Sequence, residues 1–375
     1  MKRLLLRCFF IVLSAVLLIT CNKKEDENKF SVTGVSLSKA EITLEVGAIE
    51  TLTALVEPAD ALDKSVTWES SNETIATVLN GVVEAKVAGT AYIQVTTNDG
   101  GHYDLCKVTV IDVEDKRAAM TLTTTKGGEF IIYMAGTGTM SINWGDGSVT
   151  ETLLPADEDI FDIEKRGKFA FKYDYVGNFT RTITIKGDNI THLYCYGNGL
   201  TSLDVIENVV LTYLHCYDNN LTDLDLSENM ALIELDCSSN RLSTLDLSSN
   251  KELLKLFCFE NQLISLNIGN NSKLVYLFCD YNKLANLNVS QNVMLQELWC
   301  DANYLSTLNV TNNTNLTTLG CSMNEFTADG LNALFETLHN NDGNKTIYIG
   351  ENPGTNECDT SIATEKGWKV EYNWW

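Results

Sequence analysis

A strict period of 21 residues is the feature that most constrains how this chain can fold. Its marker is a cysteine that recurs without exception, at Cys195, Cys216, Cys237, Cys258, Cys279, Cys300 and Cys321. In every repeat the residue two before the cysteine is leucine, and the residue three after it is asparagine. Self-similarity at a short fixed period is typical of stacked repeats. We therefore expect residues 188–326 to consist of stacked copies of one unit with the pattern L-x-C-x-x-N-x-L-x-x-L.

This repeat predicts a solenoid. No single unit of this length can bury its apolar side chains alone, but stacked units share a continuous core. The leucine and the cysteine of the L-x-C segment alternate inward along a parallel strand. The short outer half leaves room for extended or 3₁₀ segments instead of a helix. Across residues 190–326 the unit resembles the cysteine-ladder repeats of internalin-J-like leucine-rich-repeat proteins, which are surface adhesins.

We interpret the ladder cysteines as structural. Their spacing matches no zinc-binding pattern such as C-x-x-C, and equivalent positions on adjacent strands point in one direction, which fits the torsion of a disulfide poorly. Buried free thiols behave as small hydrophobic groups. Each repeated asparagine is expected at the bend after the strand, where its amide satisfies backbone groups of its own and the adjacent coil. Cys106 and Cys358 lie outside the ladder and have no evident partner.

Residues 32–113 alternate apolar and polar side chains in short runs separated by glycine and asparagine, which predicts an antiparallel β-sandwich. The segments 66–72 (VTWESSN), 75–78 (IATV), 81–83 (GVV) and 89–91 (GTA) resemble the bacterial immunoglobulin-like group 2 domain over about the whole module. The resemblance implies a stalk or adhesion domain. We expect Trp68 in its core.

Two smaller modules flank the repeats, and the fold class is therefore mainly β. Residues 118–187 contain an Asp-Gly hairpin signal at 144–148 (WGDGS) and resemble part of a polycystic-kidney-disease-type β-sandwich; an N-terminal cap of the solenoid describes them equally well. We interpret Asp146 as a turn residue, with calcium binding as the alternative. Residues 327–375 combine a helical period with short strands, which predicts a small α/β cap over the last coil.

Residues 1–20 predict a secretion signal, because three basic residues precede an apolar run too short to cross a bilayer. The segment 18–20 (LIT) directly before Cys21 resembles the lipobox of bacterial lipoproteins, which implies that Cys21 carries a lipid anchor in the membrane. An ordinary cleaved signal with a chance cysteine is the alternative. Residues 21–31 then form a polar tether. Its acidic cluster resembles the signal for the outer face of the outer membrane, so we expect exposure at the cell surface.

The charge of the chain disfavours some partners. Without residues 1–20 the chain has 24 basic and 50 acidic residues, a net charge of −26. Nucleic-acid binding needs Lys and Arg to neutralise phosphates, so we expect no nucleic-acid partner. We expect a monomer.

The residues that flank the inward leucine and cysteine vary from repeat to repeat, and we expect them on the concave surface. They form an aromatic strip interleaved with acidic residues. Exposed aromatic side chains beside acidic acceptors suit a sugar ring or a peptide, although they could also simply pack across strands. The predicted ligand-binding residues are Tyr194, Tyr196, Tyr213, His215, Tyr217, Asp236, Phe257, Phe259, Tyr276, Phe278, Asp280, Tyr281, Trp299 and Asp301.

The sequence gives little support for catalysis. It contains no H-E-x-x-H, G-x-S-x-G or P-loop motif. Facing carboxylates could perform glycosidase chemistry, but we expect a solenoid to lack the deep pocket that perturbs the pKa of a carboxyl. We therefore expect no enzyme, no metal and no cofactor. The leading hypothesis is a non-catalytic adhesion or protein-recognition module. The alternatives are a carbohydrate-binding lipoprotein that aids polysaccharide capture and a purely structural spacer.

Overall fold

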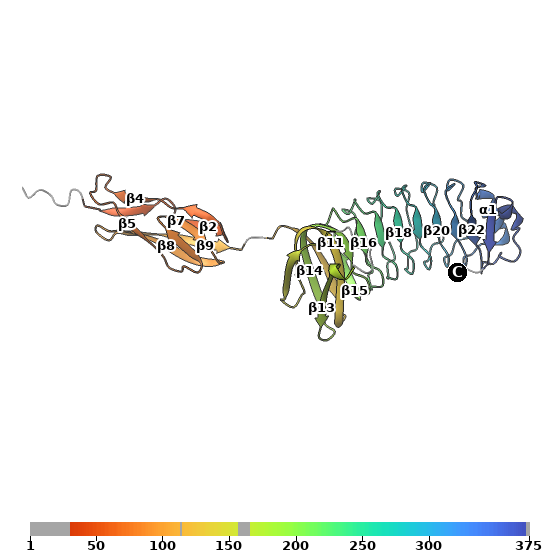
Figure 1. The fold of residues 1–375 in the computed structure, drawn as a ribbon, viewed down its shortest axis with the longest axis horizontal. Coiled ribbons are helices and arrows are strands. Elements are labelled where there is room, and N and C mark those ends of the chain that lie inside the picture. The colour runs from red at the N-terminus through yellow and green to blue at the C-terminus, as the bar shows by residue number, and fades with distance from the viewer. Residues whose placement is uncertain (1–30, 113–114, 157–165, 373–375) are drawn as a thin grey trace, which may run out of the picture. The chain divides into compact units, whose positions relative to one another are not determined.

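The computed structural model describes residues 31–112, 115–156 and 166–372, which belong to two compact units that meet at residues 115 and 116 (Figure 1). Each unit has its own hydrophobic core. The predicted secretion signal, Cys21 and nearly all of the tether lie outside the described residues. Within the described part, no helix is both long and apolar enough to cross a membrane.

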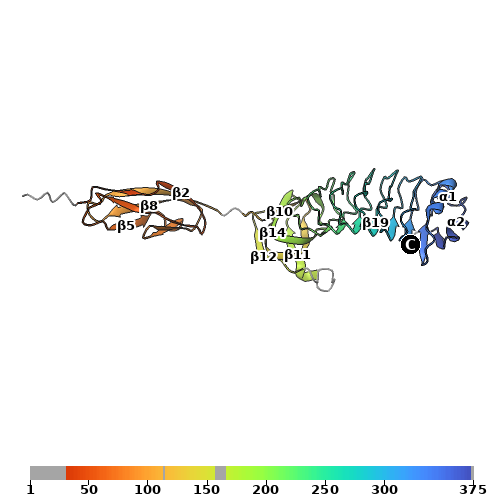
Figure 2. The same ribbon diagram turned by 90° about the horizontal axis from the view of Figure 1, so that it is seen from above.

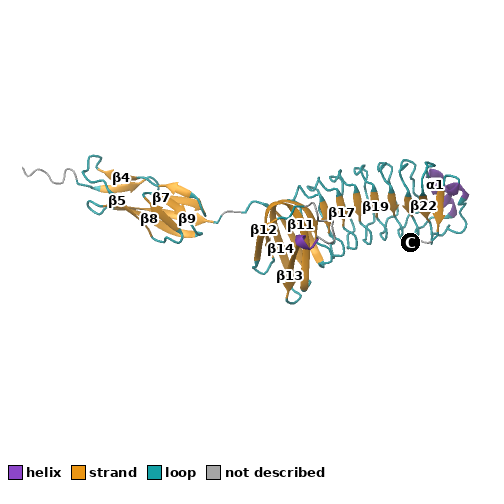
Figure 3. Ribbon diagram, viewed as in Figure 1, coloured by secondary structure: helices purple, strands orange, loops and turns teal. Residues whose placement is uncertain are grey.

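The first unit is the predicted β-sandwich. Its strands β2, β9, β8 and β5 form one sheet in that order, β3, β7 and β6 form a second, and β1 pairs with β4 (Figure 3). Alternate side chains of β8 and β9, such as Ile93 and Val108, are fully buried, and Trp68 packs against this core as predicted. The strands are β1 (Gly34–Leu37), β2 (Glu41–Glu45), β3 (Ile49–Thr51), β4 (Ala54–Glu57), β5 (Val66–Ser70), β6 (Ala76–Leu79), β7 (Val82–Ala85), β8 (Gly89–Thr97) and β9 (Tyr103–Ile111).

The second unit begins with a sheet that continues directly into the solenoid. Its elements are β10 (Ala118–Thr124), β11 (Gly128–Asn143), β12 (Val149–Leu153), the 3₁₀ helix η2 (Arg166–Phe169), β13 (Ala170–Tyr175), β14 (Arg181–Tyr194) and β15 (Leu200–Asp204). The first part of β14 pairs antiparallel with β10 and β11, whereas its last residues pair in parallel with the next solenoid strand. The domain boundary expected at residue 187 therefore falls inside a strand.

Two contacts support the interpretation of this sheet as an N-terminal cap. Asn198, the first ladder asparagine, exchanges hydrogen bonds with the backbone of Ile131 in β11. The later asparagines make the equivalent bonds to the preceding coil.

Asp146 is a turn residue, as expected, because it accepts hydrogen bonds from Ser148 and Tyr173. These hydrogen bonds lower the pKa of Asp146 to about 2, and the bond from the Ser148 side chain has the largest effect.

Six short parallel strands form one wall of the solenoid (Figures 1 and 2). Neighbouring strands are in register, so that Leu256, for example, lies opposite Leu277. We expected extended or 3₁₀ segments in the outer half of each coil; between residues 205 and 326 it consists of turns, bends and irregular segments with one isolated β-bridge, Asp246 to Asn267, and no 3₁₀ helix. One continuous apolar core runs from Met120 to Trp368. The strands are β16 (Tyr213–His215), β17 (Glu234–Asp236), β18 (Lys255–Phe257), β19 (Tyr276–Phe278), β20 (Glu297–Trp299) and β21 (Thr318–Gly320).

The repeated cysteines and asparagines have the predicted structural roles. All seven ladder thiols are free and fully buried. Burial raises the pKa of each, which keeps the thiol protonated and a poor metal ligand. Asn261 is typical of the asparagines: its amide nitrogen donates to the carbonyls of Cys237 (3.0 Å) and Cys258 (3.3 Å), and its oxygen accepts from the Leu242 backbone (2.9 Å). Each such side chain makes three hydrogen bonds and links its own coil to the preceding one.

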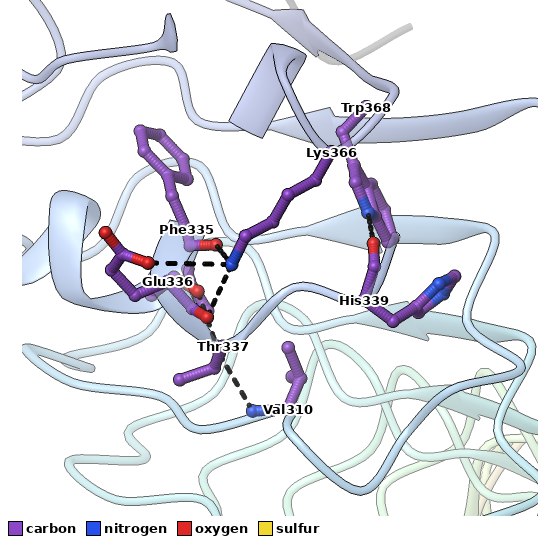
Figure 4. A network of polar contacts seen from close by, with 8 residues as sticks. Val310, Phe335, Glu336, Thr337, His339, Lys366 and Trp368 are labelled. Carbon is purple, nitrogen blue, oxygen red and sulfur yellow. Dashed lines mark hydrogen bonds and ion pairs between the residues drawn. The ribbon is translucent and has the colours of Figure 1, made fainter. Parts of the chain in front are cut away.

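The C-terminal cap closes the last coil with α1 (Ala328–Thr337), β22 (Lys345–Tyr348), α2 (Ser361–Thr364) and β23 (Trp368–Glu371). Helix α1 has no basic residue in its last turn. Lys366 reaches it instead and donates to the carbonyls of Phe335 (3.0 Å) and Glu336 (2.6 Å) (Figure 4). The Trp368 indole donates to the His339 carbonyl at 2.9 Å in the same network. The predicted α/β cap is thus held by side chains that satisfy helix-end carbonyls.

Candidate functional site

The outward side chains of the parallel strands form a surface that we call the strand face. On each strand the leucine points into the core, so the residues before and after it point out. These outward positions, together with the position after each cysteine, hold the variable residues of the repeat. The face has three parts of different chemistry.

The part nearest the N-terminal cap is aromatic and tightly packed. Tyr196 and Tyr217 stack with ring centroids 4.5 Å apart, and His192 stacks on Tyr213 at 4.4 Å. Tyr194 stacks on His215 at 4.3 Å but is only 1% exposed, because it belongs to a small core with Ala135 and Phe169. Tyr194 was expected on the exposed surface; its burial removes it from any direct ligand contact.

The middle part is an ionic network. Glu234 is bonded to His215 and to Lys255, each with a nitrogen-to-oxygen distance of 2.9 Å. Burial alone would raise the pKa of Glu234, but the hydrogen bonds from His215 and Lys255 hold it below its ordinary value. Asp236 accepts hydrogen bonds from Ser238. Its pKa is nevertheless raised by burial.

The part nearest the C-terminal cap is a hollow of about 390 Å³, which we call the aromatic hollow. Its rings are packed edge to face or tilted: the centroids of Phe257 and Phe278 are 5.1 Å apart, and those of Phe278 and Trp299 are 6.1 Å apart. Tyr348 from the cap stacks on Trp299 at 5.3 Å and extends the aromatic row. The hollow is lined by Phe257, Phe259, Phe278, Asp280, Trp299 and Asp301.

Two carboxyls of the aromatic hollow are strongly perturbed. Burial, reinforced by Glu260, raises the pKa of Asp280 to about 6. Burial, reinforced by Asp280, raises the pKa of Asp301 to about 7. We expected the solenoid to lack the deep pocket that perturbs the pKa of a carboxyl; here burial in the shallow hollow raises the pKa of both groups.

A second hollow, of about 980 Å³, lies over the outer half of the last coils and against Ala333 and Thr337 of α1. Its other lining residues are serines, threonines, asparagines, glutamine, glycine and buried leucines, such as Asn288 and Thr311. Although it is larger, it has no charged side chain. The aromatic hollow is the better candidate site, since a binding pocket combines apolar walls with a few placed polar groups.

Comparison with known proteins places the first unit in a family. A bacterial Ig-like domain (group 2) is found at residues 31–108. The chain is 46% identical over 82 residues to the Ig-like virion protein of Serratia phage KSP90, covering 21% of this chain and 32% of that protein. It is 43% identical over 81 residues to the kappa-carrageenase of Pseudoalteromonas carrageenovora, covering 21% of this chain and 20% of that enzyme. The chain thus spans about a third or less of these relatives.

A solved structure is similar to the chain over a longer stretch. The functional domain of InlJ from Listeria monocytogenes, whose description includes a cysteine ladder, is 38% identical and aligns with a TM-score of 0.41. The alignment covers 47% of this chain and 37% of that chain. The chain thus joins a bacterial Ig-like domain to a solenoid of leucine-rich coils.

The Ig-like domain contains none of the predicted ligand-binding residues, all of which lie on the solenoid. The aromatic hollow brings together Phe257, Phe259, Phe278, Asp280, Trp299 and Asp301. Tyr281 lies beside it, at a bend with φ of 52°, and is 38% exposed. Tyr276 is on the strand face but does not line the hollow.

Sequence reasoning missed Lys255, Glu234 and Tyr348 on this face. Lys255 and Glu234 are three residues before a ladder cysteine, and at that position we selected only the aromatic residues. The repeat spacing could have identified both. Tyr348 belongs to the cap, outside the 21-residue period, so no repeat signal marks it.

The histidines are occupied by structural contacts. His102 in the Ig-like domain and His339 in the cap contact backbone carbonyls, of Val32 at 3.1 Å and Leu316 at 2.7 Å. His215 pairs with Glu234, and His192 is buried. Among the described residues, no group of three or more His, Cys, Asp or Glu side chains is arranged to hold a metal ion.

Proposed function

We propose that the chain is a non-catalytic cell-surface lipoprotein that recognises a protein ligand through its strand face, with Cys21 as the lipid anchor. The observation that carries the proposal is the aromatic hollow, where half-buried rings and two carboxyls gather on an otherwise repetitive scaffold. Aromatic residues are enriched where proteins bind partners. The rigid stacked core beneath them fixes their positions.

The proposal is tested with a triple variant, Phe257→Ala, Phe278→Ala and Trp299→Ala. Wild-type and variant proteins are applied to an array of purified extracellular proteins and to a glycan array. We expect saturable binding of the wild type to at least one protein, and a loss of at least about tenfold in affinity for the variant, because buried aromatic side chains dominate interface energies.

A matched control changes exposed apolar residues outside the strand face. Ile264 is 64% exposed and Met294 is 48% exposed, so the double variant Ile264→Ala, Met294→Ala removes similar surface without touching the hollow. Circular dichroism establishes that both variants fold. Unchanged protein binding by the aromatic variant would contradict the proposal.

Two other results point to the alternative functions. Saturable binding to glycans alone, lost in the aromatic variant, would favour polysaccharide capture, since aromatic faces also stack on sugar rings. Release of reducing sugar from a polysaccharide would contradict the non-catalytic part of the proposal, and the perturbed carboxyls Asp280 and Asp301 would then be the first candidates for the catalytic pair.

A further inference from the structure

The floor of the aromatic hollow holds an unusual carboxyl. Asp301 is 1% exposed. Its Oδ1 atom accepts a hydrogen bond of 2.7 Å from the Ser322 backbone, whereas its Oδ2 atom has no hydrogen-bond partner among the described protein groups. A buried carboxylate oxygen without a partner costs free energy, and a positive charge nearby lowers that cost.

The space for this oxygen depends on the absence of a side chain at position 320. A Cβ atom at Gly320, on the next strand, would lie 2.2 Å from Asp301 Oδ2 and 2.5 Å from the Trp299 ring. Only glycine at position 320 therefore leaves room for Asp301 between Trp299 and the next coil. At the same place in the preceding coil is Asp280, which lines the hollow as well.

We propose that the aromatic hollow binds the basic side chain, lysine or arginine, of a protein ligand. The apolar stem of that side chain lies against Phe278 and Trp299, its cationic head is held by the half-buried carboxylate of Asp280, and the buried charge of Asp301 behind the hollow adds to the attraction. This inference rests on the proposed function and names the chemistry of its ligand.

Charge decides between this occupant and others. Burial is the main cause of both raised pKa values, and acidic neighbours add to it: Glu260 raises the pKa of Asp280, and Asp280 raises the pKa of Asp301. Bringing a cation into the hollow relieves that repulsion and the raised pKa values of Asp280 and Asp301. Aromatic faces attract cations as well. The chain has a net charge of −23, which steers a basic partner toward it.

The test uses the full chain and two short peptides, acetyl-Gly-Lys-Gly-amide and the same peptide with norleucine in place of lysine. Binding is followed at pH 8 through the indole N–H signal of Trp299 in nitrogen-15 NMR spectra, assigned with Trp299→Phe. We expect the lysine peptide to bind at least about tenfold more tightly than the norleucine peptide.

Two variants examine the carboxyls, with one control. Asp301→Asn keeps the acceptor for the Ser322 backbone, and Asp280→Asn removes the other charge; each should weaken lysine-peptide binding by at least about tenfold. Asp246→Asn should leave it unchanged, because Asp246 is an exposed residue of the outer half of its coil. Thermal melts establish that each variant folds.

Equal binding of the two peptides overturns the inference, as does unchanged lysine binding in both carboxyl variants or a stronger Trp299 response to N-acetylglucosamine. These results leave the proposed function standing if the array binding still depends on the aromatic rings. Failure of the proposed function is recognised separately, by array binding that survives the triple aromatic variant.

Discussion

At the scale of single residues, the solenoid contains buried polar side chains, whose burial costs free energy, at the same positions of successive coils. The ladder asparagines at the strand bends use both ends of their amides, as Asn261 does. A second set of buried asparagines, including Asn250 and Asn271, donates to carbonyls of the coils before it, but its oxygens have no partner among the described protein groups. The unpartnered oxygen of Asp301 differs from these because it belongs to an ionisable group that lines a hollow.

We expect Asp301→Asn to stabilise the solenoid at high pH. Folding raises the pKa of Asp301 from 3.8 to about 7. As pH rises between these values, the unfolded chain loses this proton first, so rising pH favours unfolding of the wild type. Above pH 7 the folded wild type carries the full cost of a buried carboxylate, and the neutral amide does not. The shift of about three pKa units corresponds to a gain of roughly 4 kcal/mol at pH 8, and the gain should be near zero at pH 4.

Urea unfolding at the two pH values measures this gain. Asp246→Asn is the matched control: hydrogen bonds from Ser248 lower the pKa of Asp246, so removing that charge should give no gain at pH 8. A stability difference between wild type and Asp301→Asn that does not grow with pH would show that the carboxyl is not perturbed in the folded state.

Residue positions were predictable from the sequence wherever the period reaches them. It correctly put the ladder cysteines in the core and the asparagines at the bends. It could not show that Tyr194 is covered, because Phe169 and Ala135 come from a module with no repeat. It also could not show how far Asp301 is desolvated, because that depends on Gly320 of the next coil packing against Asp301 and Trp299.

At the scale of elements, each coil turns at the same backbone conformation. The residue two after each ladder cysteine has a positive φ, from Gly197 at 67° to Met323 at 55°. Only the first of these positions is glycine, and the others hold residues such as Glu260 and Ala302, for which the left-handed region is unfavourable. Stacking of the coils must therefore impose this bend. The sequence did not reveal it, because no glycine recurs there.

We expect Lys366→Met to loosen the C-terminal cap. The methionine keeps much of the apolar stem but leaves the carbonyls of Phe335 and Glu336 without the ammonium that now bonds them (Figure 4). A cation at a helix C-terminus and a charge-assisted hydrogen bond together suggest a loss of roughly 1–2 kcal/mol. Urea unfolding of the solenoid transition measures it.

The control for this change is Lys273→Met. Lys273 forms an ion pair with Glu252 in which both side chains are about half exposed, so its loss should change the free energy of unfolding by less than about 0.5 kcal/mol. Equal effects of the two substitutions would mean that Lys366 does not secure the cap.

The elements themselves were partly predictable. The strands of the Ig-like domain and the α/β nature of the C-terminal cap follow from alternation and helical period in the sequence. The status of residues 118–187 does not, since their pattern fits both a sandwich and a cap. Only the pairing of β14 with β16 shows that one strand serves both the module and the first coil.

At the scale of the whole molecule, each of the two units has its own main core. The core of the Ig-like domain and the core that runs through cap, solenoid and C-terminal closure share no residues. The second core is continuous because each coil packs only on its neighbours, with both ends closed by non-repeat modules. The strand face therefore belongs to the second unit alone.

This separation predicts two unfolding transitions in calorimetry of the full chain, since units with separate cores unfold independently. Ile93→Ala in the Ig-like domain and Leu256→Ala in the solenoid both remove fully buried side chains, at a cost of about 2–5 kcal/mol each. We expect Ile93→Ala to lower the midpoint of the Ig-like transition only, and Leu256→Ala to lower that of the solenoid transition only. At temperatures near the solenoid midpoint, only Leu256→Ala should weaken binding of the lysine peptide. If either variant shifted both midpoints together, the two cores would be coupled, and a substitution in the Ig-like domain could then alter the aromatic hollow.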